Sequence, residues 1–205
     1  MSDDPFDRTG EGRARTARTA TGHARVGAPG TQDKAPASLR PPLLPSGLRA
    51  LCSHWHDGPE AVEAGVGPDA GAYLLAVWLP ETVPLPPALC QPERDHIAGG
   101  WLVYAGSARG PGGLRARLRR HMRRDKGCRW HVDWLTTAPG ARVWAAAVPA
   151  GDECALACAV RGLPGATTPV PGFGSSDCRT CPSHLIRLPE DVALAARDGP
   201  GGSPL

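Results

Sequence analysis

A short apolar run near the middle of the chain constrains the fold more than any other feature. Residues 72–79 read Ala-Tyr-Leu-Leu-Ala-Val-Trp-Leu, and the run is bounded by Gly71 and Pro80. An apolar run of this length between turn residues is typical of a largely buried strand. We therefore predict that this segment is a buried strand of a folded domain.

Four further elements follow this strand. Two more strands are predicted at residues 101–104 and 141–148, and two helices at residues 114–124 and 152–160. A glycine-rich turn at residues 110–113 precedes the first helix, and two carboxylates lie in the first turn of the second, where they suit the helix dipole. The order strand, strand, helix, strand, helix predicts a small α/β or α+β domain.

Composition divides the chain into segments. Of its 205 residues, 26 are Gly and 23 are Pro, well above average usage. Residues 1–45 contain almost no large aliphatic side chains, so we predict a disordered arm rich in Arg, Gly and Pro. Residues 46–69 are interpreted as a short packing segment or linker, residues 70–188 as the folded domain, and residues 189–205 as a flexible tail.

Positive charge is concentrated in one part of the chain. The formal net charge is only +3, but eight arginines and Lys126 lie between Arg109 and Arg129, against Asp125 alone. Such a stripe can neutralise phosphates, although basic clusters are often only solvated faces. The stripe makes nucleic acid the expected partner. The candidate binding residues are Arg115, Arg119, Arg120, Arg123 and Arg124.

The sequence has no feature that predicts a membrane or an export route. No apolar run approaches the ~18 residues needed to span a bilayer, and the N-terminus lacks the pattern of a secretory signal. The seven cysteines are an odd number, so reduced thiols are expected rather than a disulfide framework. We therefore expect a cytoplasmic protein without a membrane partner.

The helix predicted at residues 114–124 carries the first candidate site. Arg117 and His121 share a helix face with Leu114 and Leu118, at spacings of three and four residues. An unpaired charge on a buried stripe is costly, so the two side chains need an explanation. Either they face a phosphate, which Arg binds bidentately, or they lie at the edge of the stripe with their polar ends in water.

Two short motifs contain the only tyrosines of the chain, Gly71-Ala72-Tyr73 and Tyr104-Ala105-Gly106. They resemble the two signatures of the GIY-YIG nuclease superfamily, with Ala in place of the central Ile. The helix from Arg117 to His121 resembles its Arg-x-x-x-His helix, and Glu153 begins a helix as its metal-binding Glu does. A poorly characterised branch of the superfamily is more similar still. Its motifs match Gly106-Ser107-Ala108, Gly112-Gly113-Leu114, Trp130-His131-Val132-Asp133, Ser176-Asp177-Cys178 and Ser183-His184-Leu185.

This resemblance implies a fold and a reaction. It implies a small three-stranded mixed sheet flanked by helices, and hydrolysis of a phosphodiester with one divalent cation. Glu153 would bind Mg²⁺ or Mn²⁺, and Arg117 would stabilise charge on the phosphate. Tyr73, helped by Tyr104 or His121, would take a proton from the attacking water.

The motifs of the branch add accessory candidates. His131 and Asp133 either extend the active site or order a loop, while Trp130 and Trp134 are expected in the core. Asp177 and His184 are further accessory candidates.

Cysteines near the end of the domain suggest a second metal. Cys178, Cys181 and His184 have a spacing compatible with zinc, with Cys128 or Cys154 as a fourth ligand, although a tight reduced loop explains the same residues. Cys52, His54 and His56 lack a fourth ligand of matching spacing, so zinc is not expected there.

Three functions remain open from the sequence. The first is a metal-dependent endonuclease, acting on DNA in preference to RNA. The second is a nucleic-acid-binding module of the same fold without cleavage, and the third is an interaction protein stabilised by zinc. No appended recognition domain is visible, so a targeting partner is a further expectation.

Overall fold

The computed structural model describes residues 43–190, and its centre is a four-stranded sheet in the order β5-β1-β4-β6. The strands are β1 (Gly71–Leu79), β4 (Gly100–Ala108), β5 (Arg142–Pro149) and β6 (Leu185–Leu188). The expected α+β class, with a sheet flanked by helices, is confirmed. The sheet has one strand more than expected, and its pairings are antiparallel, not mixed. The additional strand, β6, has only four residues, and it pairs with β4, which is distant in sequence.

Strand β1 is central because both of its faces are buried. Leu75 and Val77 belong to one apolar core, and Leu74 and Ala76 belong to a second core on the opposite face. Successive side chains of a strand point to opposite faces, so the uninterrupted apolar run supplies both cores. The strand predicted at residues 72–79 therefore lies between the two layers of the domain.

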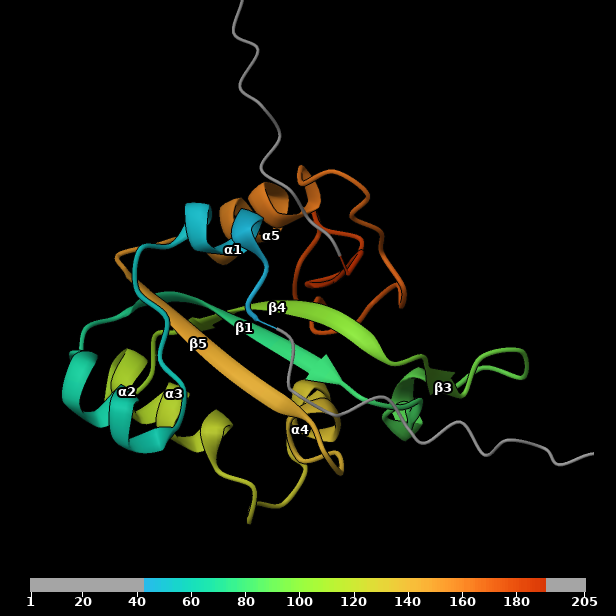
Figure 1. The fold of residues 1–205 in the computed structure, drawn as a ribbon, viewed down its shortest axis with the longest axis horizontal. Helices are drawn as coiled ribbons and strands as arrows, with labels where there is room; N and C mark the ends of the chain where they lie inside the picture. Colours follow the sequence, from blue (N-terminus) through green and yellow to red (C-terminus); the bar gives the residue numbers. More distant parts are fainter. Residues whose placement is uncertain (1–42, 191–205) are drawn as a thin grey trace, which may run out of the picture. The chain divides into compact units, whose positions relative to one another are not determined.

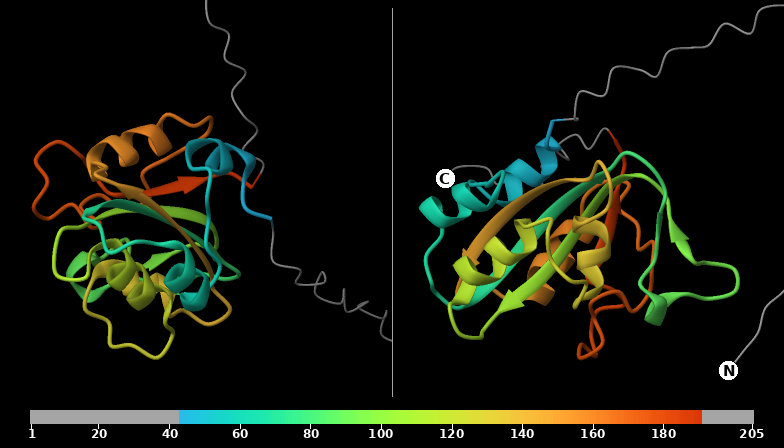
Figure 2. Two further views of the ribbon diagram at one scale, coloured as in Figure 1. Left: turned by 90° about the vertical axis from the view of Figure 1, so that its left-hand side faces the viewer. Right: turned by 90° about the horizontal axis from the view of Figure 1, so that it is seen from below.

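Helices cover both faces of the sheet (Figures 1 and 2). One face carries α2 (Pro59–Gly65), α3 (Gly113–Met122) and α4 (His131–Thr136). The other carries α1 (Ser46–Leu51) and α5 (Glu153–Arg161), with the loop that follows α5 beside them. The connection from β1 to β4 holds a two-stranded ribbon of β2 (Val83–Pro84) and β3 (His96–Ile97) and the short helix η1 (Pro87–Leu89).

The predicted helices form with small differences at their ends. Helix α3 ends at Met122, two residues early, because Arg123 adopts extended backbone angles. Helix α5 begins after Asp152, whose carboxylate accepts a hydrogen bond from the backbone N–H of Ala155 at 2.8 Å. Helix α4 was not predicted, and it contains His131 and Asp133.

Some expectations fall on residues that the structure does not describe. The predicted arm (residues 1–45) and tail (residues 189–205) lie outside the described residues, apart from residues 43–45 and 189–190. Within residues 43–190, no helix has both the length and the apolar character required to cross a membrane.

Candidate functional site

A cavity of about 280 Å³ brings together residues from both tyrosine motifs, from three helices and from the loop after α5. Tyr73 and Tyr104 come from β1 and β4, Arg117 from α3, and Glu153 from the start of α5. The other lining residues are Ser107, Arg129, Trp130, His131, Gly174, Ser176, Asp177, Cys178 and His184. Residues distant in sequence therefore form one site.

Two glycines make room for the tyrosines. The rings of Tyr73 and Tyr104 lie 6.3 Å apart between centroids. A Cβ atom at Gly106 would collide with the hydroxyl end of Tyr73, and one at Gly174 would collide with the ring of Tyr104. Gly174 also has a φ of +69°, which glycine adopts without strain. Gly106, the last residue of the second signature, is therefore needed to leave space for Tyr73, the tyrosine of the first signature.

Tyr73 and His121 form a buried pair. The Tyr73 hydroxyl lies 2.9 Å from His121 Nε2, and both side chains are almost completely buried. Burial lowers the pKa of His121 to about 4, so the imidazole is neutral at pH 7. Burial also raises the pKa of Tyr73 well above its usual value, with Tyr104 and Glu153 adding to the effect and Arg117 opposing it. The pair therefore consists of a phenol and a neutral imidazole.

Tyr104 is the second phenol of the cavity. Burial and the negative charge of Glu153 raise the pKa of Tyr104 to about 12, against the opposing effect of Arg117. Both tyrosines are thus protonated at neutral pH in the free protein.

Asp133 lies behind His121 and is the centre of a charge cluster. Its side chain is fully buried, and it accepts two hydrogen bonds of 3.0 Å from Arg120 and one of 2.9 Å from each backbone N–H of Arg129 and Trp130. Lys126 Nζ and His121 Nδ1 each lie 3.6 Å from Asp133 Oδ1.

These contacts keep the Asp133 carboxylate charged. Burial opposes its ionisation, but the neighbouring His121, Arg120 and backbone N–H groups outweigh burial and hold the pKa of Asp133 well below its usual range. The negative charge faces His121 Nδ1. A proton on Nδ1 is therefore favoured, which leaves Nε2 free to accept the Tyr73 O–H.

Arg117 and Arg129 are the cationic residues of the cavity, and both lie against Trp130. The Arg117 guanidinium carbon is 4.4 Å from the centre of the Trp130 ring, and that of Arg129 is 5.5 Å away. Among residues 43–190, no carboxylate lies within ion-pair distance of either guanidinium. Both charges are therefore available to an anion. Trp130, expected in the core, is half-buried and forms part of the cavity wall, and Trp134 is also half-buried.

The five arginines expected to bind nucleic acid all have partners within the chain. Arg119 pairs with Glu63 at 2.9 Å, and Arg123 pairs with Asp125 at 3.3 Å. Arg115 and Arg124 donate to backbone carbonyls, and Arg120 binds Asp133. None of the five lines the cavity. The stripe therefore serves the protein's own packing to a large extent.

Two carboxylates line the cavity, those of Glu153 and Asp177. Glu153 is the first residue of α5 and is half-buried, while Asp177 is exposed on the following loop. The adjacent Asp152 caps the helix instead. The register of this turn therefore directs Glu153, and not Asp152, to the cavity.

His131 and Asp133 have different places in the structure. His131 lines the cavity, and its Nδ1 accepts a hydrogen bond of 3.2 Å from the backbone N–H of Gly174. Asp133 does not line the cavity and instead orders the segment before α4. Asp133 therefore orders a loop, which is one of the two alternatives considered from the sequence, and the role of His131 in an active site stays a prediction.

Beside the cavity lies a group of three cysteines and one histidine that could hold a metal ion. The donor atoms of Cys154, Cys178, Cys181 and His184 all lie within 4.8 Å of one another. Cys154 is therefore the fourth member, whereas Cys128 is exposed and contacts Thr137. Hydrogen bonds from Thr180 and the backbone lower the pKa of Cys178 to about 5, while the contact with Cys178 raises the pKa of Cys154 to about 11.

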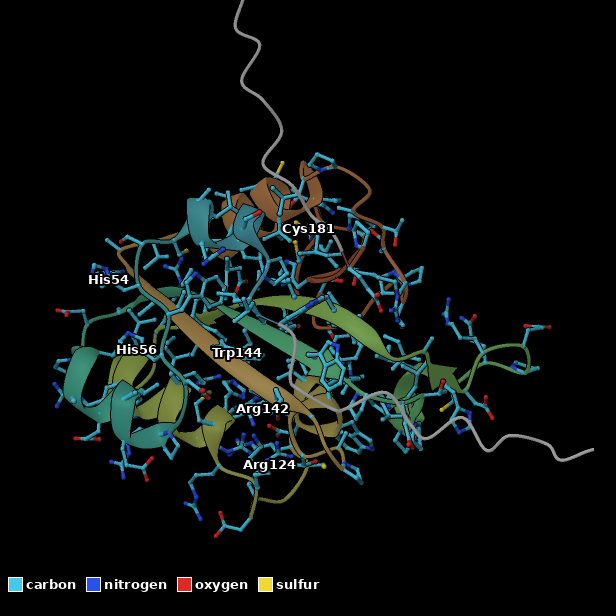
Figure 3. All side chains as sticks on the ribbon, viewed as in Figure 1. His54, His56, Arg124, Arg142, Trp144 and Cys181 are labelled. Atoms are coloured by element: carbon cyan, nitrogen blue, oxygen red, sulfur yellow. The ribbon has the colours of Figure 1, made fainter. Side chains whose placement is uncertain are left out.

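The earlier cysteine and histidines are not part of this group. Figure 3 labels His54 and His56 on the segment between α1 and α2, away from Cys181. His56 exchanges two backbone hydrogen bonds with Ala145 of β5, and His54 contacts Ser53. These contacts explain the positions of His54 and His56 without a metal ion.

The sequence predicted many of the residues that line the cavity and missed others. It named Tyr73, Tyr104, Arg117, Glu153, His131, Asp177 and His184, all of which line the cavity. It did not name Arg129 or Ser176 as site residues. Ser176 begins one of the branch motifs, which is a usable signal, but nothing in the sequence separates Arg129 from its arginine neighbours.

Comparison with known proteins identifies a family and no closer relative. No curated protein and no solved structure matches the chain. One family model, described as a domain of unknown function, DUF123, matches residues 73–198, which is more than half of the chain. The matched segment includes the tyrosines, the α3 helix, Glu153 and the cysteine cluster. The chain therefore belongs to the DUF123 family.

Proposed function

We propose that this protein is a divalent-metal-dependent endonuclease that hydrolyses phosphodiester bonds, with DNA as the first substrate to test and RNA the second. The observation that carries the proposal is the convergence of Tyr73, Tyr104, Arg117 and Glu153 on one cavity, with His121 bonded to Tyr73. These are the residue types expected from the resemblance to GIY-YIG nucleases. The first four come from two strands and two helices and line the same cavity.

The cations of the cavity suit a phosphate. Arg117 has no carboxylate partner among the described residues, and Trp130 restrains its guanidinium by stacking. A restrained guanidinium can bind phosphate oxygens and stabilise the charge that develops during hydrolysis. Arg129 offers a second cation on the same tryptophan.

The buried pair suits removal of a proton. The phenol of Tyr73 cannot act as an anion at pH 7, because its pKa is raised. It can take a proton from water while its own proton passes to His121 Nε2, 2.9 Å away. Asp133, 3.6 Å from His121 Nδ1, would stabilise the imidazolium that results. The base is therefore the Tyr73–His121 pair rather than the tyrosine alone.

Mg²⁺ or Mn²⁺ is the proposed metal, and Glu153 its ligand. Carboxylate oxygen is the ligand such hard ions prefer, and Mg²⁺ is commonly held by one or two carboxylates together with substrate phosphate. Asp177 offers a second carboxylate on the same cavity. When bound, the ion would polarise the phosphate and lower the pKa of a bound water.

Zinc, the other metal that the sequence left possible, would have its donors in the cysteine cluster. Thiolate and imidazole suit zinc, whereas the carboxylates of Glu153 and Asp177 suit Mg²⁺ or Mn²⁺; Cys178 and His184 of the cluster line the same cavity. A zinc ion there is compatible with either a nuclease or an interaction protein, so it does not decide between them. A targeting partner remains a proposal that the cavity does not address.

Cleavage of a panel of branched, nicked and single-stranded DNA and RNA, with Mg²⁺ or Mn²⁺, tests the function. Wild type would be compared with E153Q, R117A and Y73F. We expect metal-dependent cutting, reduced at least about 100-fold in each variant, because each removes a group that acts on the transition state.

R119A is the matched control. Arg119 lies on the same helix, but it pairs with Glu63 and does not line the cavity. It should retain cutting near the wild-type rate. Salt-sensitive binding without cutting would favour the non-catalytic binding module, and absence of both would contradict a nucleic-acid function.

A further inference from the structure

The cysteine cluster has the dimensions of a tetrahedral metal site. Cys154 Sγ lies 3.5 Å from Cys178 Sγ and 3.8 Å from His184 Nε2. With Zn–S bonds of about 2.3 Å, a tetrahedron has sulfur–sulfur edges of about 3.8 Å. The cluster therefore needs little rearrangement to surround one ion.

Hydrogen bonds already hold the ligands in this arrangement. The backbone of His184 donates to the carbonyl of Phe173 at 2.9 Å and accepts from the N–H of Ala105 at 3.0 Å. The backbone N–H of Cys181 donates to Cys178 Sγ at 3.2 Å. A donor directed at sulfur favours the thiolate, which is the form that binds metal. Contacts with β4 and within the loop thus hold His184, Cys178 and Cys181, while Cys154 is placed by helix α5.

A disulfide explains the cluster less well. Joining Cys154 to Cys178 would require the two sulfurs to approach from 3.5 Å to about 2.05 Å, and it would leave Cys181 and His184 without a role. Apolar packing accounts for part of the cluster only: Cys181 packs against the second core, but this does not explain why Cys154, Cys178 and His184 lie beside it. One ion uses all four side chains.

We propose that Cys154, Cys178, Cys181 and His184 bind one Zn²⁺ in a closed structural site. Four protein ligands fill the tetrahedral shell, so the ion has no open position for a substrate. The site joins the first turn of α5 to the loop of residues 175–184, two segments that are far apart in sequence.

The zinc site also positions one wall of the cavity. Glu153 directly precedes Cys154 in the chain, and Asp177 directly precedes Cys178. Each of the two carboxylate residues of the cavity is therefore the sequence neighbour of a proposed zinc ligand. Cys178 and His184 themselves line the cavity. Bound zinc would therefore hold the two carboxylates at a constant separation. Zinc binding itself does not depend on the proposed nuclease function.

Metal analysis of the 205-residue chain, purified from zinc-supplemented cells, tests the proposal first. We expect one zinc ion per chain in wild type and a large loss in C154S, C178S and C181S. C158S is the matched control, because Cys158 lies one turn along α5 from Cys154, is exposed and is outside the cluster. It should retain a full zinc ion.

Cobalt substitution gives a test that does not require the variants to fold. Wild type loaded with Co²⁺ should show the intense visible spectrum of tetrahedral cobalt and a sulfur-to-cobalt charge-transfer band. Zinc-loaded protein should also melt at a higher temperature than protein stripped by a chelator.

Three results would overturn the proposal. The first is wild-type protein that contains no zinc and shows no tetrahedral cobalt spectrum. The second is full zinc content in a variant that lacks both Cys154 and Cys178, and the third is a disulfide between these two residues in protein purified under reducing conditions. None of these readouts uses cleavage, so failure of the zinc site and failure of the nuclease proposal are distinguishable.

Discussion

At the scale of single residues, the most informative feature is a histidine that folding keeps neutral. His121 is buried between Tyr73, Trp130 and Asp133, and its pKa is lowered to about 4 because desolvation disfavours the charged form. A neutral imidazole beside a phenol can accept a proton, whereas an imidazolium cannot. The burial that keeps His121 neutral also makes the fold sensitive to acid.

The stability of the fold should therefore fall as the pH is lowered from 7.5 to 5.5. An unfolded His takes up a proton near pH 6.5, whereas folded His121 takes it up near pH 4, so acid favours the unfolded chain in this window. The contribution of His121 over this range is about 1 kcal/mol. Urea unfolding of wild type and H121Q at several pH values measures it, with a shallower pH dependence expected for H121Q.

H54Q is the control for this prediction. The His54 side chain is exposed, so H54Q controls for the loss of a surface histidine. Equal slopes for H121Q and wild type would contradict a buried neutral His121.

At the scale of elements, helix α4 is held by one carboxylate. Asp133 accepts hydrogen bonds from the two backbone N–H groups before the helix, and it binds Arg120 of α3 through both oxygens. It therefore joins two helices and directs Trp130 and His131 toward the cavity. The Trp-His-x-Asp motif is an anchoring device as well as a source of a cavity residue.

Replacing Asp133 with Asn should destabilise the fold by about 3 kcal/mol. The substitution removes the charge that compensates Arg120 and Lys126, and loss of one partner from a buried ion pair typically costs this amount. The midpoint of urea unfolding measures the loss. D125N is the control, because Asp125 is exposed and pairs only with exposed Arg123, so no measurable change is expected. An unchanged midpoint in D133N would refute the anchoring role.

At the scale of the whole molecule, the arrangement of charges matters more than their sum. The net charge is only +3, and most arginines between Arg109 and Arg129 contact groups of the chain itself. The cavity nevertheless exposes Arg117 and Arg129 without carboxylate partners among the described residues. Under the proposed function, binding of nucleic acid should therefore depend on these two arginines more than on the rest of the stripe.

The salt dependence of DNA binding tests this distribution. Each phosphate neutralised by the protein adds about −0.9 to the slope of log affinity against log salt concentration. R117A and R129A should each flatten the slope by about one. R119A should change it less, because Glu63 already neutralises Arg119. A larger effect of R119A than of R117A would show that the stripe, and not the cavity, binds DNA.

The sequence by itself determined the elements with strong local signals. The apolar run at residues 72–79 contains enough buried surface to be a strand in any compact arrangement, and the Leu114, Arg117, Leu118, His121 spacing defines a helix face. Glycine-rich turns set the start of α3. These signals depend on neighbouring residues, so they are readable without the fold. The tyrosine, arginine and glutamate candidates were likewise recognised from motifs.

Only the tertiary structure decided which candidates meet. Strand β6 is too short to be recognised locally, and its partner β4 is brought to it by the fold. In the sequence the arginine stripe suggests one continuous basic surface. In the structure most of its arginines are instead engaged by Glu63, Asp133 and backbone carbonyls of the chain itself. Cys154 and not Cys128 joins the cluster, because α5 returns beside the final loop. Such pairings depend on long-range packing, which local sequence patterns do not encode.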